Sequence, residues 1–332
     1  MPRLYLHIGT HKTGSTAIQQ LLWKHRQALA TAGLLYPDVG VRRDAHHAIA
    51  WAAGTTRAAP DAAALRAMVE DLIRQAGTSA QSILLSSEEF EFVQRVQELA
   101  LLKDHFEVKV IVYLRKQDEY LEAAYNQHVR SYDLRFTGSI YQFALGYNFF
   151  WRFDYWRILQ NWGDVFGVEN VIVRPYGTDL VDDDALADFL SLLPLPGDLC
   201  RDIAGETIRI NRALHPRAIP YMARINKMSL SREQHQAAQG ILRKVMPHER
   251  GFRFLRDDEA SRFYEGFESD NEALFRTFMG LDHDAFRRAA DGADASRWID
   301  HDEIEPDVLV ALVEAIFQEA GRKRLRQLLD AG

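Results

Sequence analysis

Residues near the N-terminus combine glycines, a lysine and hydroxyl side chains at a spacing that suits phosphate binding. The apolar run Leu4–Ile8 is followed by Gly9-Thr-His-Lys-Thr-Gly14 and then by Ser15 and Thr16. A loop that joins a strand to a helix in this way directs backbone N–H groups and the positive end of the helix dipole at one point. The sequence therefore predicts a phosphate-binding loop.

The position of the lysine distinguishes this loop from that of an ATPase. Nucleoside triphosphate-binding loops follow the pattern Gly, four residues, Gly, Lys, then Ser or Thr. Gly9, Gly14 and Thr16 match this pattern, but Ser15 stands at the lysine position and Lys12 lies within the loop. A lysine placed there does not reach the β- and γ-phosphates as it does in an ATPase. We therefore expect a different phosphate-bearing donor.

The elements that must position this loop alternate between strand and helix over the first two hundred residues. Strands are expected at Leu4–Ile8, Ser82–Leu85, Val108–Leu114 and Asn170–Val173. Helices are expected at Ser15–Ala32, Asp61–Ala76, Val96–His105, Asp118–Ser131 and Phe153–Phe166. Apolar strands between helices indicate an α/β fold with a mostly parallel sheet flanked by helices.

Beyond Pro194, Pro196 and Gly197 the pattern becomes helical, with no strong strand. Helical spacing recurs in Ala213–Lys227, Arg232–Val245, Ala260–Met279 and Pro306–Leu329. We expect an α/β core over residues 1–200 and a helical extension over residues 201–332, with a soft boundary at 195–210. The extension is interpreted as a lid, a homodimer surface or simple packing, and the sequence leaves these open.

Composition excludes several classes of protein. The formal net charge of −7 argues against a nucleic-acid binder. A single cysteine, Cys200, permits no intrachain disulfide and no thiolate zinc site, and the twelve histidines show no metal-ligand spacing, so no metal is expected. No apolar run approaches the ~18–20 residues of a transmembrane segment, and the first strand begins too early for a signal peptide. We therefore expect a cytoplasmic protein.

A second motif, Tyr113-Leu-Arg115 at the end of a predicted strand, supports a family resemblance when it is combined with the loop. Together they resemble the sulfotransferases that use 3′-phosphoadenosine 5′-phosphosulfate (PAPS). Residues 7–15, His-Ile-Gly-Thr-His-Lys-Thr-Gly-Ser, are most similar to the bacterial branch. Similar segments at Ser86–Glu89, Val173–Tyr176 and Asn211–Leu214 extend the resemblance over roughly residues 3–215.

The resemblance implies a fold of the phosphate-binding-loop (P-loop) type and a reaction. The expected activity moves a sulfuryl group from PAPS to a hydroxyl of a carbohydrate or other cell-envelope acceptor. The products are a sulfate ester and 3′-phosphoadenosine 5′-phosphate (PAP). A sulfuryl group carries less charge than a terminal phosphoryl group, so one lysine and backbone dipoles are expected to suffice without Mg²⁺.

The resemblance also assigns donor-binding roles. Lys12 would contact the bridging oxygen and the sulfuryl group, and His11 would face the sulfuryl oxygens. The 5′-phosphate would be bound by four consecutive residues, Thr13, Gly14, Ser15 and Thr16. Arg115 would bind the 3′-phosphate through a bidentate contact.

One position departs from the family pattern. Eight residues after the arginine the family usually supplies a serine hydroxyl to the 3′-phosphate, but here the residue is Ala123. The missing hydrogen bond to a charged group would cost roughly 1.5–3 kcal/mol. Tyr125, Asn126 or Arg130 is expected to compensate, with Tyr125 included in the predicted site.

The acceptor hydroxyl must lose a proton, which calls for a general base near Lys12. Glu88, which follows the strand at 82–85, is the favoured candidate. His47 and then His46 come next, and they are candidates because imidazole titrates near neutral pH. Alternatively, Ser86–Glu89 simply begins the next helix.

Two other functions stay open: a P-loop kinase, and a non-catalytic nucleotide-binding protein, which Ala123 favours.

Overall fold

The computed structural model describes most of the chain, namely residues 1–77, 82–146, 150–177, 180–181, 184–206, 213–247, 249, 251–287, 297–300 and 304–318. The chain divides into two compact units that alternate along the sequence. The α/β unit comprises residues 1–116, 152–210 and 267–288. The helical unit comprises residues 117–151, 211–266 and 289–332.

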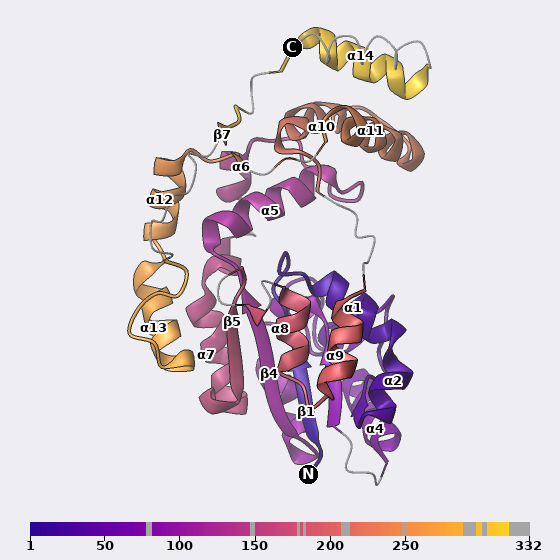
Figure 1. The fold of residues 1–332 in the computed structure, drawn as a ribbon, viewed down its shortest axis with the longest axis vertical. Coiled ribbons are helices and arrows are strands. Elements are labelled where there is room, and N and C mark those ends of the chain that lie inside the picture. The colour runs from indigo at the N-terminus through magenta and orange to yellow at the C-terminus, as the bar shows by residue number, and fades with distance from the viewer. Residues whose placement is uncertain are drawn as a thin grey trace. The chain divides into compact units, whose positions relative to one another are not determined.

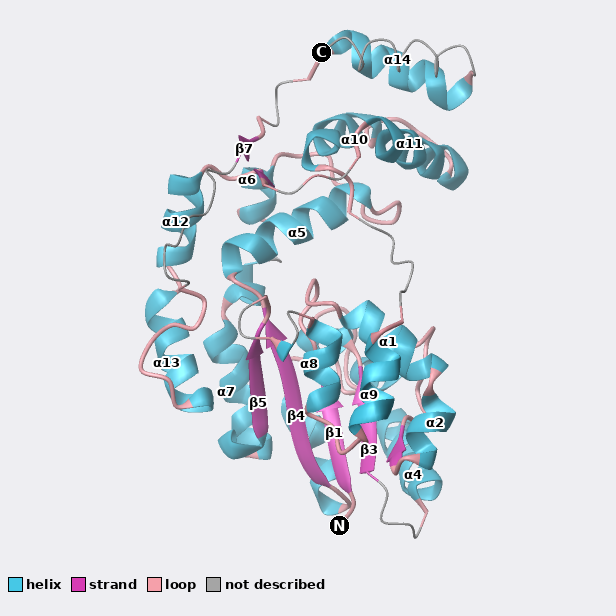
Figure 2. Ribbon diagram, viewed as in Figure 1, coloured by secondary structure: helices cyan, strands magenta, loops and turns pink. Residues whose placement is uncertain are grey.

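The α/β unit is built on a five-stranded sheet with the strand order β2-β3-β1-β4-β5. The strands are β1 (Arg3–His7), β2 (Leu34–Leu35), β3 (Ser82–Ser86), β4 (Glu107–Leu114) and β5 (Val171–Pro175). All neighbouring strands are parallel, so their carboxyl ends meet at one edge of the sheet, where the arrowheads lie in Figure 2. The predicted α/β fold with a mostly parallel sheet is confirmed.

Two helices of the α/β unit match the ranges predicted at 61–76 and 153–166, two predicted helices differ, and three observed helices at 47–52, 185–191 and 197–204 had not been predicted. Its main helices are α1 (Ser15–Lys24), α2 (Arg26–Thr31), α3 (His47–Ala52), α4 (Ala62–Ala76), α7 (Tyr155–Phe166), α8 (Ala185–Ser191), α9 (Gly197–Ala204) and α13 (Glu268–Met279). The 3₁₀ helices η1 (Glu88–Phe92) and η2 (Val96–Asp104) follow β3. The helix predicted over 15–32 breaks at His25, whose ψ of 11° leaves the helical range. The helix predicted over 96–105 is the 3₁₀ helix η2.

Both faces of the sheet are covered. On one face, α1, α8 and α9 pack against the strands (Figure 1). This buried cluster includes Tyr5, Leu84, Ile111 and Tyr113 from the strands and Ile18, Leu21, Phe189, Leu190 and Ile203 from the helices. Helix α7 contacts β4 and β5, and α13 contacts α7 and β5. Burial of the sheet by helices explains why its strands are apolar almost throughout.

The helical unit contains six α-helices among its described residues and one small sheet. The helices are α5 (Gln117–Arg130), α6 (Ile140–Ala144), α10 (Ile219–Ile225), α11 (Arg232–Val245), α12 (Asp257–Glu265) and α14 (Pro306–Phe317). Two short strands, β6 (Phe252–Arg253) and β7 (Arg297–Trp298), pair in parallel, where the sequence predicted no strand. In the described part of the chain, no helix combines the length and the apolarity needed to cross a membrane.

The two units divide the chain differently from the predicted boundary at residue 200. Helix α5 was expected in the core, but it packs against α6, α10 and α12 of the helical unit. The helix predicted over 260–279 is interrupted at Gly266, and its second half, α13, joins the α/β unit. The last predicted helix, 306–329, ends as α14 at Phe317, and its residues from 319 onward lie outside the described residues.

Candidate functional site

The predicted phosphate-binding loop leaves β1, the central strand, where the chain changes direction across the sheet. The chain leaving β1 next enters the sheet at β2 on one edge, and the chain leaving β4 next enters it at β5 on the other. Open α/β sheets bind ligands at the carboxyl ends of the strands beside such a switch point. The loop after β1 and Arg115 after β4 therefore lie where a ligand is expected.

The backbone of the loop adopts conformations that require glycine at two positions and impose strain at a third. Gly9 and Gly14 have φ values of 43° and 84°. Lys12 has a φ of 72°, which is uncommon for a residue with a side chain. Such backbone strain is concentrated at ligand-binding loops. The lysine that distinguishes this loop from an ATPase loop is thus held in a specific, unfavourable conformation.

Two threonine hydroxyls hold the loop in place through hydrogen bonds to backbone carbonyl oxygens. The Thr10 hydroxyl donates to the Tyr113 carbonyl oxygen at 2.8 Å, and the Thr13 hydroxyl donates to the Thr10 carbonyl oxygen at 2.7 Å. Helix α1 then begins after Gly14 with no side-chain cap, so its first N–H groups receive no side-chain acceptor. An uncapped helix start of this kind attracts an anion through its N–H groups and its dipole.

Arg115 follows the end of β4, and its side chain contacts the loop. Its Nη1 atom donates to the Lys12 carbonyl oxygen at 3.4 Å, and its Cζ atom lies 5.6 Å from the centre of the Tyr176 ring. Tyr176 follows β5, and its Cε2 atom would lie 3.9 Å from a Cβ atom placed on Gly14. A guanidinium group and an aromatic ring thus flank the start of α1 at the same edge of the sheet.

Glu88 also lies beside the loop. A Cβ atom on Gly9 would meet the Cα of Glu88 at 3.5 Å, and the buried Gln19 amide of α1 donates to the Glu88 carboxylate at 2.7 Å. Burial opposes ionisation of Glu88, but nearby His11, the hydrogen bond from Gln19 and nearby His47 together hold its pKa below the ordinary value. Glu88 is therefore an ionised carboxylate at neutral pH.

The two histidines of the His46-His47 pair differ in what their ring nitrogens do. His46 is fully buried, its Nδ1 accepts from the Ser86 backbone N–H at 3.1 Å, and its Nε2 donates to the Pro37 carbonyl oxygen at 2.9 Å. Burial lowers the pKa of His46 to about 4. Both ring nitrogens of His46 are thus bonded to backbone groups, which favours a structural role over that of a base. His47 is half-buried, and its Nδ1 lies 2.7 Å from the Ser87 hydroxyl oxygen.

Tyr125 lies in the other unit, on α5. It is buried, and its hydroxyl donates to the Gly138 carbonyl oxygen at 3.0 Å within the helical unit. The Asn126 amide nitrogen likewise donates to the Leu214 carbonyl oxygen at 3.0 Å. The Tyr125 hydroxyl and the Asn126 amide nitrogen thus each donate to a backbone carbonyl oxygen within the helical unit.

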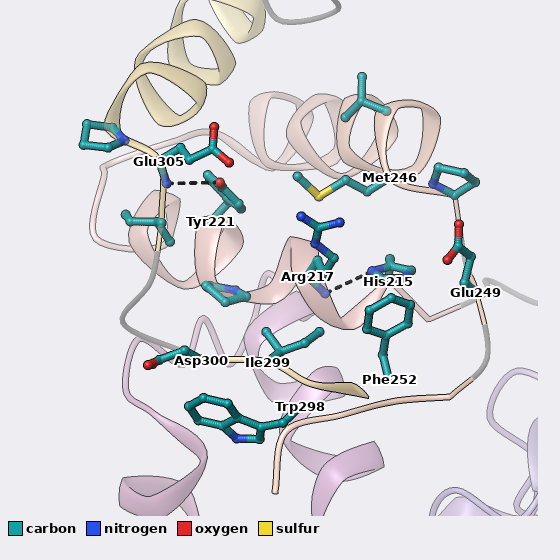
Figure 3. A pocket seen from close by; sticks show the side chains of 15 residues that line it. His215, Arg217, Tyr221, Met246, Glu249, Phe252, Trp298, Ile299, Asp300 and Glu305 are labelled. Atoms are coloured by element: carbon teal, nitrogen blue, oxygen red, sulfur yellow. Dashed lines mark hydrogen bonds between the residues drawn. The ribbon is translucent and has the colours of Figure 1, made fainter. Parts of the chain in front are cut away.

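A cavity of about 750 Å³ lies within the helical unit. Rings of Tyr221, Phe252 and Trp298 line it, and the Arg217 guanidinium extends into it (Figure 3). The Tyr221 hydroxyl accepts a hydrogen bond from the Glu305 backbone N–H at 3.2 Å. None of the site residues predicted from the sequence lines this cavity.

Sequence reasoning missed four residues that shape the candidate site: Gln19, Tyr176, Glu91 and Arg152. Gln19 orients Glu88, and Tyr176 flanks Arg115. Glu91 is a buried carboxylate that contacts both His11 and Arg152. The run of acidic residues after β3 was a signal for Glu91, but no local pattern marks Arg152. Across the described residues, no three His, Cys, Asp or Glu side chains are gathered as metal ligands would be.

Comparison with known proteins leaves the family unassigned. No family model matches the chain. A protein of Archaeoglobus fulgidus, described as uncharacterized, is 31% identical over 176 residues, which cover 52% of this chain and 46% of that protein. The match thus spans about half the length of that relative. A crystal structure of a sulfotransferase from Alicyclobacillus acidocaldarius aligns with a TM-score of 0.41 and 16% identity over 84% of this chain and 98% of that chain.

Proposed function

We propose that this protein is a sulfotransferase that moves a sulfuryl group from PAPS to a hydroxyl of a carbohydrate or other cell-envelope acceptor. The products are a sulfate ester and PAP. The observation that carries the proposal is the loop itself: Lys12 is held with a positive φ before an uncapped helix start, and Arg115 lies beside it. This arrangement suits a donor with one anion at the loop and a second phosphate near Arg115.

Different residues of the loop are proposed to bind different groups at the 5′ end of the donor. The backbone N–H groups from Thr13 to Thr16, at the start of α1, are suited to the 5′-phosphate, whereas the Thr13 hydroxyl is bonded within the loop. Lys12 would neutralise charge on the oxygen that joins phosphorus to sulfur as that bond breaks. PAPS supplies the activated sulfuryl group, and the loop contributes position and charge.

Arg115 is proposed to recognise the 3′-phosphate. Guanidinium forms bidentate contacts with phosphate oxygens, and the Tyr155 hydroxyl holds the Arg115 backbone carbonyl at 2.7 Å. The family serine is replaced by Ala123, and we leave Tyr125 out of the proposed site because its hydroxyl already has a partner. We also propose that the Tyr176 ring orients the Arg115 guanidinium.

Glu88 is proposed as the general base. It is ionised, it is oriented by Gln19, and it lies against Gly9 of the loop. His47 is the alternative, because it lies close enough to influence the charge of Glu88.

The experiment that tests the function is an acceptor screen with radiolabelled PAPS. Label transferred to a hydroxyl compound by the wild-type protein, without added Mg²⁺, supports a sulfotransferase. Binding of PAP with no transfer to any acceptor favours the non-catalytic nucleotide-binding reading. Hydrolysis or transfer of the γ-phosphate of ATP favours the kinase reading. The predicted helical extension, residues 201–332, remains a proposed lid or homodimer surface, which sedimentation with and without PAP would test.

A further inference from the structure

A buried ionic chain runs from the α/β core to the loop. The carboxylate of Glu91 in η1 is buried and accepts hydrogen bonds from the Arg152 guanidinium, Nε at 2.8 Å and Nη2 at 3.1 Å. Arg152 is itself 4% exposed, so this ion pair is shielded from solvent on both sides. Burial opposes the charge, yet Arg152 and His11 hold the pKa of Glu91 well below its ordinary range. Glu91 is therefore a fixed negative charge beneath the loop.

His11 is attached to this chain at two atoms. Its backbone N–H donates to Glu91 Oε2 at 2.9 Å, and its ring Nδ1 donates to the same oxygen at 2.7 Å. An ionised carboxylate accepts only, so the proton on this ring nitrogen is required. The ring also packs edge-on against Phe92, with the ring centres 5.0 Å apart. The imidazole is thus fixed in position and in tautomer.

The second ring nitrogen of His11 is Nε2. Within the described part of the chain, Nε2 makes no hydrogen bond, and the side chain keeps 19% of its surface exposed. The His11 backbone N–H is bonded to Glu91, whereas a phosphate-binding loop ordinarily directs such N–H groups toward its anion. A charged imidazole in the same loop would replace that neutral donor with a stronger one.

Charged side chains lie around His11 on several elements. Glu91 and Glu88, both in η1, act on it as anions, and Arg152 neutralises Glu91 from the far side. Lys12 is the adjacent cation of the loop. The Arg57 guanidinium lies over the ring of Phe92, which packs against His11. His47, from α3, also influences Glu88. An incoming phosphate or phosphosulfate adds further negative charge, which stabilises a proton on Nε2.

We propose that His11, anchored by Glu91 and Arg152, binds the 5′-phosphate or phosphosulfate anion as an imidazolium, so that donor binding takes up a proton. This inference rests on the proposed function, because it concerns the same loop. It makes His11 the titratable partner of Lys12 in the loop. Donor affinity should then weaken as the pH rises through the titration of imidazole.

The test is calorimetry of PAP binding from about pH 6 to about pH 8.5, where imidazole loses its proton. Titrations in two buffers of different ionisation enthalpy give the number of protons taken up. We expect wild-type affinity to fall about tenfold more across this range than that of His11→Asn. Free PAP titrates near pH 6 in both experiments, so its contribution cancels, and the difference between the two proteins reports His11 together with its effect on the bound phosphate.

His25→Asn is the matched control, because His25 also lies against a carboxylate, that of Glu206, but at the far end of α1. It should keep the wild-type proton uptake. An independent readout is the ¹⁵N chemical shift of the His11 ring, which should report Nε2 protonation when PAP is added. Equal pH dependence in wild type and His11→Asn, with PAP bound in both, overturns this inference and leaves the proposed function intact. Absence of PAP binding to the wild type at every pH overturns the proposed function as well.

Discussion

The loop after β1 and helix α5 were both expected to hold the donor, yet their polar groups are used in opposite ways. In the loop, Lys12 is held in a strained conformation and the first turn of α1 has no side-chain cap. On α5, the polar side chains are engaged within the helical unit: Asp118 and Glu122 pair with Arg253, and Tyr125 and Asn126 donate to backbone carbonyls. The polar groups of the loop thus surround a helix start that has no side-chain cap, whereas the side chains named on α5 take part in packing within the helical unit.

Replacing Lys12 with alanine should have the largest effect. Removing one preorganised donor from a site of developing charge typically lowers kcat by about 10²–10³-fold. PAP affinity should be partly retained, because the helix start and Arg115 remain. Transfer assays and calorimetry on Lys12→Ala measure the two quantities. Lys24→Ala, at the far end of α1, is the control and should behave as wild type. A Lys12→Ala enzyme with full turnover would contradict the proposed role of the loop.

Replacing Arg115 with lysine should weaken PAP binding about 10–100-fold, because a lysine cannot make the bidentate contact. Adenosine 5′-phosphate, which lacks the 3′-phosphate, provides the internal control. Its affinity should be the same for Arg115→Lys and wild type. If both ligands lose affinity equally, Arg115 supports the loop through the Lys12 carbonyl oxygen instead of contacting the nucleotide.

Replacing Glu88 with glutamine should lower kcat about 10²-fold without weakening PAP binding. The amide oxygen can still accept from Gln19, so the geometry is preserved. Because the pKa of Glu88 is held below its ordinary value, the active carboxylate form persists at neutral pH, and activity should be lost only as the pH falls through that low pKa. A pH–rate profile measures this acidic limb. Full activity in Glu88→Gln combined with inactivity of His47→Asn would transfer the role of base to His47.

Replacing Tyr125 with phenylalanine should have the smallest effect and should touch stability alone. Loss of the hydrogen bond to the Gly138 carbonyl oxygen should lower the free energy of unfolding by about 1 kcal/mol. Urea denaturation measures this change, and calorimetry should show unchanged PAP affinity. A loss of PAP affinity at unchanged stability would return Tyr125 to the donor site and remove the contrast between the loop and α5.

Short-range chemistry explains what could be predicted from the sequence. The strand ends at His7 and Leu114 and the glycines of the loop are marked by local patterns, because a parallel sheet needs apolar runs and a positive φ favours glycine. The parallel sheet and the location of Lys12 and Arg115 at its carboxyl edge follow from these signals.

Long-range packing explains what could not be predicted. Arg152 pairs with Glu91 across 61 positions of the chain, and Asn126 meets Leu214 across 88. No periodicity marks such partners. The break at His25 involves neither glycine nor proline, and the role of His46 depends on backbone groups of Pro37 and Ser86 that only the fold brings to it.

Comparing the affinities of PAP and of ATP with Mg²⁺ for the wild-type protein tests the central claim most directly. The account predicts that PAP binds without added metal and that ATP with Mg²⁺ competes poorly, because Lys12 is out of register for a triphosphate. Tight binding of ATP with Mg²⁺, together with no detectable binding of PAP, would contradict it.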